Sequence, residues 1–199
     1  STPDHTHAPA AMMAMHKGIH VYVQKPMTHT VWEARQMTML ANKKGLCTQM
    51  GNQGTATDGI REGAEYVRSG GLGDVKEIHA WTNRPVWPQA PGIVARPAEV
   101  MSVPDHIDWD SFIGPAPMRP YHSCYTPFKW RGWWDYGTGA LGDMGCHLID
   151  VPFKALSLKY PKSVECSIGK ILTGMYQTAY TPNGCPPSAA VSLTFGATE

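Results

Sequence analysis

The chain has 199 residues, and its 17 lysines and arginines against 16 acidic residues leave a formal net charge of +1 at pH 7. This balance offers no basic surface to phosphate backbones, so the composition argues against a nucleic-acid partner. An apolar fraction of 42% with 17% charged residues is typical of a globular protein that can bury a core. No apolar run approaches the roughly 20 residues that span a bilayer. No charged-then-apolar leader opens the sequence, so we expect neither a membrane contact nor a visible targeting signal.

Helical and strand-like patterns alternate at the start of the chain. Apolar residues spaced at i, i+3, i+4 and i+7 predict a helix over 7–17, and the alternating run 19–23 predicts a strand. A capping box begins a second predicted helix over 30–45, and 46–50 again resembles a strand. Short connections between such elements are typical of a layered α/β sheet with parallel strands. Residues 1–52 are therefore predicted to form part of one.

The pattern changes after this point. A helix around 60–67 and a strand over 75–82 are predicted first. The segment 84–128 then carries more than half of the chain's 17 prolines and holds no lasting periodicity, so we expect a long loop. Its many aromatic residues indicate that this loop is ordered. Regular structure is expected to resume near residue 139.

Cysteine usage and the two ends of the sequence bear on its surroundings. The five cysteines form no CxxC pair, which argues against a disulfide framework and a structural zinc site, and reduced thiols favour the cytoplasm. An export signal on a preceding segment would instead imply the periplasm. The sequence begins without Met, and residues 190–195 resemble a strand without partners, so we expect a chain truncated at both ends.

The strongest chemical pattern is the trio Asp143, His147 and Asp150, at i, i+4 and i+7 among apolar neighbours. On one helix they would lie within about 40° of one another. Carboxylates on either side would stabilise the charged imidazole and select one ring tautomer, which suits proton transfer. Pro152 implies a kink, so the argument is firmer for the first two residues. A helix cap, a core histidine and a solvated carboxylate remain the structural alternative.

Three other patterns are ambiguous. Asp143 and His147 could reach a cation, but no third ligand is near, so no metal is predicted. Lys25 follows the predicted strand 19–23, where α/β sheets bind ligands, although most such lysines are merely solvated. Residues 137–142 match GxGxxG but follow no buried strand, so we reject them as a pyrophosphate loop. We expect their glycines to let the backbone pass close to a ligand or another chain.

Three motifs in order resemble the Gfo/Idh/MocA family of NAD(P)-dependent oxidoreductases. They are Thr2-Pro3 with His7, the stretch Lys17 to Pro26, and the stretch Gly139 to His147. The resemblance implies an α/β chain in which residues 1–52 are the C-terminal part of a Rossmann dinucleotide-binding domain. Residues 53–199 would be an incomplete α+β domain with an open, mostly antiparallel sheet. Family members often form dimers or tetramers through this second domain.

The resemblance also implies a site for NAD or NADP. Thr2 and Pro3 would line the nicotinamide end, and Lys25 would contact both nicotinamide and substrate. The other implied cofactor contacts are Gln24, Asn52 and Gln53. The amide of Gln24 stands where the family has a carboxylate, and an amide can still accept and donate hydrogen bonds.

Substrate contacts are expected from two places. The resemblance implies that Asp150 binds substrate hydroxyls, and a tryptophan-dense segment contributes Arg131, Trp133 and Trp134, which suit the faces and hydroxyls of a carbohydrate. This segment is similar to one in a subgroup of bacterial proteins that often carry twin-arginine export signals.

Three functions follow as hypotheses. In a dehydrogenase acting on a sugar or polyol, His147 would exchange the carbinol proton with help from Asp143, while Lys25 stabilises the alkoxide and hydride moves to the nicotinamide. A redox-neutral glycosidase or lyase would use the same residues to oxidise a sugar hydroxyl transiently. A non-enzymatic dimerising module would be recognised by His147→Ala altering stability and no turnover.

Overall fold

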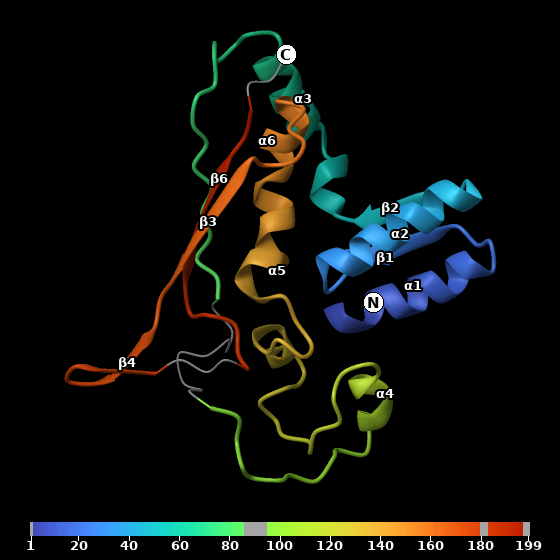
Figure 1. Cartoon of the computed structure of the whole chain (residues 1–199), viewed down its shortest axis with the longest axis vertical. Helices are drawn as coiled ribbons and strands as arrows, with labels where there is room; N and C mark the ends of the chain where they lie inside the picture. The colour runs from blue at the N-terminus through green and yellow to red at the C-terminus, as the bar shows by residue number, and fades with distance from the viewer. Residues whose placement is uncertain (1, 86–94, 180–182, 197–199) are drawn as a thin grey trace.

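The computed structural model describes residues 2–85, 95–179 and 183–196. The first part of the chain is a layered α/β unit, coloured blue in Figure 1. Its elements are η1 (Asp4–Thr6), α1 (His7–His16), β1 (Val21–Gln24), α2 (Val31–Lys44) and β2 (Thr48–Gly51). β1 pairs in parallel with β2, and α1 packs against both β1 and α2. The helix-strand alternation and the parallel pairing predicted for residues 1–52 are confirmed.

Local signals explain where these elements begin and end. Thr30 accepts a hydrogen bond from the Glu33 amide, and the Glu33 side chain accepts one from Thr30, which completes the predicted capping box at α2. The helix ends at Gly45, whose φ of 63° is the left-handed geometry that glycine adopts without strain. The buried faces meet in one cluster, made of Ala8, Ala11, Met15, Val23, Met37 and Leu40.

The second part combines a column of helices with small antiparallel sheets. Its helices are η2 (Gln53–Ala56), α3 (Asp58–Arg68), α4 (Trp109–Ile113), η3 (Lys129–Gly132), α5 (Gly139–Leu148) and α6 (Asp150–Ala155). Its strands are β3 (Ser163–Ile168), β4 (Ile171–Gly174), β5 (Gln177–Ala179) and β6 (Ala189–Thr194). β3 pairs with β6, and β4 with β5, both antiparallel. The open, antiparallel character expected of this part is confirmed.

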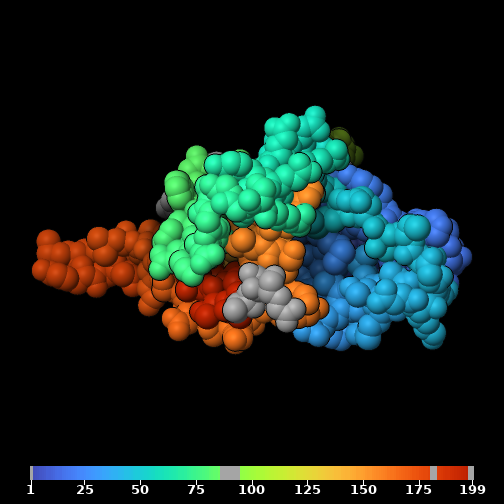
Figure 2. All heavy atoms as spheres, turned by 90° about the horizontal axis from the view of Figure 1, so that it is seen from above, coloured from blue at the N-terminus to red at the C-terminus, as the bar shows by residue number. Residues whose placement is uncertain are grey.

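The arrangement in space places the helices centrally. In Figure 1, α5 and α6 form a column between the blue α/β unit and the strands, and α6 packs on α3. The β4–β5 hairpin projects away from the rest, and Figure 2 shows it at the opposite end from the α/β unit. α5 is therefore the helix of the second part that lies next to the α/β unit.

Two expectations about strands were wrong. Residues 75–82 form no strand, and no backbone hydrogen bond joins them to other described residues. The strand expected at residues 190–195 is present as β6, but it was expected to lack partners and instead pairs with β3 along its whole length. In both cases the alternation of side chains indicated an extended backbone. It carries no information about which neighbour supplies the hydrogen bonds.

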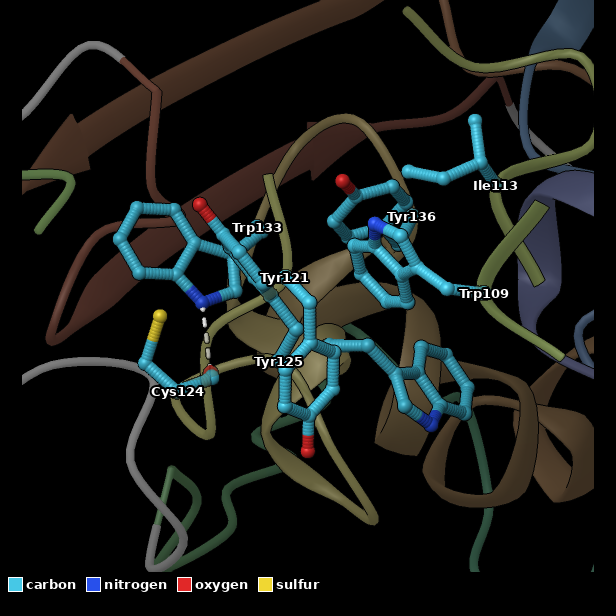
Figure 3. Close-up of a cluster of buried hydrophobic side chains, with 8 residues drawn as sticks. Trp109, Ile113, Tyr121, Cys124, Tyr125, Trp133 and Tyr136 are labelled. Atoms are coloured by element: carbon cyan, nitrogen blue, oxygen red, sulfur yellow. Dashed lines mark hydrogen bonds between the residues drawn. The ribbon is translucent and has the colours of Figure 1, made fainter. Parts of the chain in front are cut away.

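The long loop is ordered by a cluster of aromatic side chains, drawn in Figure 3. Trp109 stacks on Phe112 and Tyr125 at centroid distances of 5.0 and 5.8 Å. Trp133 donates a hydrogen bond of 3.0 Å from Nε1 to the Cys124 carbonyl oxygen. Rings of this size bury large apolar areas, so the cluster compensates for the loop's lack of regular structure. The ordering that the aromatic content predicted is confirmed for residues 95–128, and residues 86–94 of the predicted loop lie outside the described residues.

Two side chains of the tract Asp4, His5 and His7 join the two parts, whereas the His7 ring contacts the carbonyl oxygens of Thr2 and Pro26 within the first part. The Asp4 carboxylate accepts from the backbone N–H (3.1 Å) and Oγ1 (2.8 Å) of Thr138. The His5 ring lies against the carbonyl oxygens of Phe112 and Ile113, each at 3.1 Å. These three side chains are buried and face different partners. Within the described ranges, no three metal-ligating side chains converge, and no helix is long and apolar enough to cross a membrane.

Candidate active site

Lys25 and Asp143 form the centre of the candidate site. Lys25 follows the last residue of β1, and its Nζ donates to Asp143 Oδ1 at 2.7 Å and to the Asp143 carbonyl oxygen at 2.9 Å. The side chains are only 17% and 8% exposed. An ion pair this poorly hydrated is strongly coupled, so each group depends on the other for its charge to be tolerated.

A pocket of about 280 Å³ opens beside this pair. Arg131 Nε lies 3.7 Å from Asp143 Oδ1, and the Arg131 guanidinium stacks over the Trp130 ring at 4.2 Å. Asp143 Oδ2 is buried and has no hydrogen-bond partner among the described residues. Lys25 and Arg131 thus both lie beside the Asp143 carboxylate at this pocket, and Asp143 Oδ2 can still accept a hydrogen bond. The lining residues of the pocket are Thr2, Asp4, Gln24, Lys25, Trp130, Arg131 and Asp143.

Glycines bring α5 into position. A Cβ at Gly137 would lie 2.5 Å from Arg131 Cα, and Gly139, with φ of 64°, would place a Cβ 2.9 Å from Cys185 Cβ. These glycines do permit a close approach, but the neighbours are segments of this chain and not the expected ligand or second chain. Thr138, the residue before α5, is held by the buried Asp4 carboxylate. The start of the helix that carries Asp143 is thereby fixed.

His147 lies one turn beyond Asp143 on α5 and is half-buried. Burial lowers its pKa first and the charge of Lys25 lowers it further, while Asp143 and Asp150 act in the opposite direction. The flanking carboxylates act on the pKa of His147 in the predicted direction, but burial and Lys25 outweigh them, so the imidazolium is not favoured overall. The ring also makes no hydrogen bond to another described residue, so no tautomer is selected by a protein partner. A neutral imidazole is the form suited to accept a proton.

Asp150 does not share the helix of Asp143 and His147. α5 ends at Leu148 and Asp150 opens α6, so the predicted single stripe of three residues was wrong. Asp150 Oδ2 accepts a hydrogen bond of 2.6 Å from Thr55 Oγ1. The carboxylate remains close enough to His147 to influence its pKa.

The C-terminal ends of the parallel strands β1 and β2 lie side by side next to Lys25. Gln24 pairs in register with Gly51, and a Cβ at Gly51 would lie 2.8 Å from Gln24 Oε1. Asn52 follows β2 and donates from Nδ2 to the Cys146 carbonyl oxygen at 2.7 Å, which connects the strand end to α5. Asn52 Oδ1 is buried without a partner among the described residues, and Gln53 is exposed. Carboxyl ends of parallel strands are where α/β sheets bind ligands.

Comparison with known proteins identifies the chain at the level of family. Residues 1–52 match the GFO_IDH_MocA family model described as "Oxidoreductase family, NAD-binding Rossmann fold". Residues 92–168 match the model described as "Oxidoreductase family, C-terminal alpha/beta domain". The two models occur in this order and together cover more than half of the sequence. The chain belongs to the Gfo/Idh/MocA oxidoreductase family.

Several solved structures share the fold of this chain. WlbA dehydrogenase from Bordetella pertussis has a TM-score of 0.60 at 16% identity, covering 98% of this chain and 47% of its own. An oxidoreductase domain protein from Kribbella flavida has a TM-score of 0.58 at 22% identity, covering 98% and 44%. For an inositol dehydrogenase homolog from Azotobacter vinelandii the values are 0.52, 18%, 85% and 35%. The chain spans less than half of each. A search of curated proteins finds no match.

This Gfo/Idh/MocA chain departs from the expected substrate contacts at one tryptophan. Trp133 is 2% exposed and belongs to the aromatic cluster, so its proposed contact with a sugar was wrong. Trp134 is 43% exposed but does not line the pocket, whereas Arg131 does. Trp130 and Asp4 line the pocket and were not expected there. Two signals could have indicated them. Trp130 precedes Arg131 in the sequence, and Asp4 is a carboxylate within the motif that contains Thr2, Pro3 and His7.

Proposed function

We propose that the full-length protein is an NAD(P)-dependent oxidoreductase that acts on a sugar, a polyol or a related carbohydrate. The observation that carries this proposal is the Lys25 Nζ to Asp143 Oδ1 contact of 2.7 Å, which lies beside a pocket where β1 ends. A half-buried histidine whose pKa is lowered by burial lies one turn away on α5. A fixed cation at the pocket and a neutral base one helical turn from Asp143, itself outside the pocket's lining, are the groups that carbinol oxidation requires.

The residues present fit the nicotinamide end of a dinucleotide. Thr2, Gln24 and Lys25 line the pocket, and Asn52 follows the neighbouring strand end with its Oδ1 buried and without a partner among the described residues. Pro3 and Gln53 adjoin these positions in sequence. Buried acceptors without donors favour a ligand with amide or hydroxyl hydrogens. When bound, the nicotinamide supplies the acceptor for the hydride.

The protein's own groups would handle the proton and the developing charge. His147 is the proposed proton acceptor because its neutral form is favoured by burial and by the nearby charge of Lys25. Lys25 Nζ would stabilise the alkoxide as the carbinol proton leaves. Asp143 would hold Nζ in place through its carboxylate and its carbonyl oxygen, at 2.7 and 2.9 Å.

A carbohydrate is the favoured substrate class for two reasons. Arg131 stacked on Trp130 offers donors beside an apolar ring face, a combination that suits hydroxyls and C–H faces of a sugar. Among the similar structures, the Azotobacter vinelandii protein is complexed with NADH and myo-inositol, and the Bordetella pertussis protein with NADH and UDP-GlcNAcA. Trp134 and Asp150 remain proposed substrate contacts, although neither lines the pocket.

We propose a division into a first domain, residues 1–52, and a second domain, residues 53–199. The second domain is the expected contact between subunits, as the family resemblance implies. The outward residues of β3 are exposed along its whole length. We therefore propose a homodimer or homotetramer that assembles through this domain. Light scattering on the full-length protein tests it, and a monomer at micromolar concentration would exclude it.

The test of the enzymatic proposal uses the full-length protein with NAD or NADP and a panel of free sugars, polyols and aryl glycosides. Nicotinamide absorbance and aglycone release are followed together. Accumulation of reduced cofactor supports the dehydrogenase, and aglycone release without net reduction supports the redox-neutral glycosidase or lyase. His147→Ala should abolish either signal, whereas His16→Ala, at an exposed helix end, should not. Absence of both signals and of nucleotide binding would refute the proposal and favour a non-enzymatic module.

A further inference from the structure

A second pocket, of about 190 Å³, lies in the long loop beside the aromatic cluster. Its wall includes Arg96, Glu99, Arg119, His122 and Tyr125. The two loop segments that form the pocket are joined by a backbone hydrogen bond of 3.2 Å from the Met101 amide to the Tyr121 carbonyl oxygen. None of these residues belongs to the proposed active site, so the pocket requires its own explanation.

Two guanidinium groups in this wall share a single carboxylate. Arg96 Nη2 lies 2.7 Å from Asp135 Oδ2, and Arg119 Nε contacts the same oxygen. Arg96 is held further by Tyr125, whose hydroxyl accepts from Nη1 at 3.1 Å, and by the Trp133 ring, 4.8 Å below its guanidinium. One carboxylate neutralises one of the two charges. The wall's other acid, Glu99, is 74% exposed and forms no ion pair with either guanidinium among the described residues, so the two guanidinium groups have only Asp135 between them.

The remaining polar atoms of the wall are mostly donors. Arg96 Nε is buried without a partner, and the terminal nitrogens of Arg119 have none among the described residues. The Cys124 amide donates to His122 Nδ1 at 3.0 Å, so the hydrogen of the neutral ring is on Nε2. Glu99 is the one competing acceptor, but its side chain is 74% exposed and 4.0 Å from His122 Nε2. Donors without acceptors around a cavity favour an acceptor-only ligand group.

We propose that this pocket is a second binding site, for the carboxylate or phosphoryl group of a small molecule. A planar guanidinium fork matches the paired oxygens of either group, and a charge-assisted bond is stronger than a neutral one. The volume suffices for such a group with a few further atoms. A neutral sugar could accept a hydrogen bond from Arg96 Nε through a hydroxyl, but that bond lacks the charge assistance an anion gives, so the sugar should bind more weakly here.

Calorimetric titration of the full-length protein without nucleotide tests the proposal. The probes are glucuronate, glucose 6-phosphate and inorganic phosphate, with glucose as the neutral control. We expect at least one anion to bind more tightly than glucose at this site, and the preferred anion distinguishes a carboxylate source from a phosphoryl source. Arg119→Gln should weaken the affinity about tenfold or more, because it removes a charged donor. Arg61→Gln is the control, since that side chain is 58% exposed on α3.

Arg119→Lys guards against misfolding of the glutamine variant, because it keeps the charge and loses only the fork. We expect it to weaken anion affinity as well, with an unchanged circular dichroism spectrum. Failure of every anion to bind more tightly than glucose would overturn the proposal. So would anion affinity that is the same in the wild type and in a folded Arg119 variant. Because the titration needs neither nucleotide nor turnover, its result is separate from that of the proposed oxidoreductase activity.

Discussion

Lys25 and Asp143 are 118 positions apart in the sequence, yet the ammonium group of one lies 2.7 Å from the carboxylate of the other. The contact joins the end of β1 to the middle of α5. It is both the junction between the two parts of the chain and the centre of the candidate site. Its buried position makes it expensive to disrupt and easy to test.

Lys25→Met should lower the free energy of unfolding by about 3 kcal/mol, because it leaves the Asp143 carboxylate buried without its cation. The double variant Lys25→Met/Asp143→Leu should lose less than the sum of the single losses. Urea unfolding measures all three. Lys76→Met is the control, since its pair with Asp74 is 79% and 91% exposed and should change stability by no more than about 0.5 kcal/mol. Equal losses for Lys25→Met and Lys76→Met would contradict the prediction.

NMR titration of the imidazole resonances should find His147 with a pKa below 6.5, because burial and the charge of Lys25 both lower it. The folded state then binds fewer protons than the unfolded state as the pH falls below 6.5. The contribution of His147 to stability is therefore complete above that value and is lost as the pH falls through the folded pKa. Lys25→Met should raise the pKa. A His147 pKa above 6.5 would show that the flanking carboxylates dominate after all.

Adjacent tryptophans should respond differently to truncation. Trp133→Ala should cost about 3–5 kcal/mol of stability, because a ring only 2% exposed leaves a cavity and an unpaired Cys124 carbonyl. Trp134→Ala, at 43% exposure, should cost far less. Thermal unfolding of the two variants makes the comparison. If Trp134→Ala were the more damaging, the assignment of Trp133 to the core would be wrong.

Gly137→Ala should destabilise the protein by about 1–3 kcal/mol, because the added Cβ would lie 2.5 Å from the backbone of Arg131. This clash would push apart the backbone segments that precede α5. Gly63→Ala is the matched control within α3, where a Cβ meets nothing within 4 Å. There the same substitution should stabilise the helix by up to about 1 kcal/mol. Chemical denaturation of both variants measures the difference, and similar values would mean that the loop adjusts freely around Gly137.

The sequence predicted what local signals determine. The capping box at Thr30 and the left-handed Gly45 marked the limits of α2, and the spacing of Asp143 and His147 placed both on one helix. It could not reveal the partner of Lys25, because only the folded chain brings β1 and α5 together. The break between Leu148 and Asp150 was also missed, since the apolar pattern continues across it. Adjacent tryptophans carry no sequence signal that separates core from surface.

The most direct test of the proposed catalytic centre is the rate of nicotinamide reduction by the full-length protein carrying His147→Gln, with His16→Gln as the control, on the best substrate of the panel. If His147 accepts the carbinol proton, its loss should slow reduction by about 10²–10⁴-fold while nucleotide affinity stays unchanged. Reduction at the wild-type rate in the His147→Gln protein would contradict the account and remove His147 from the chemistry.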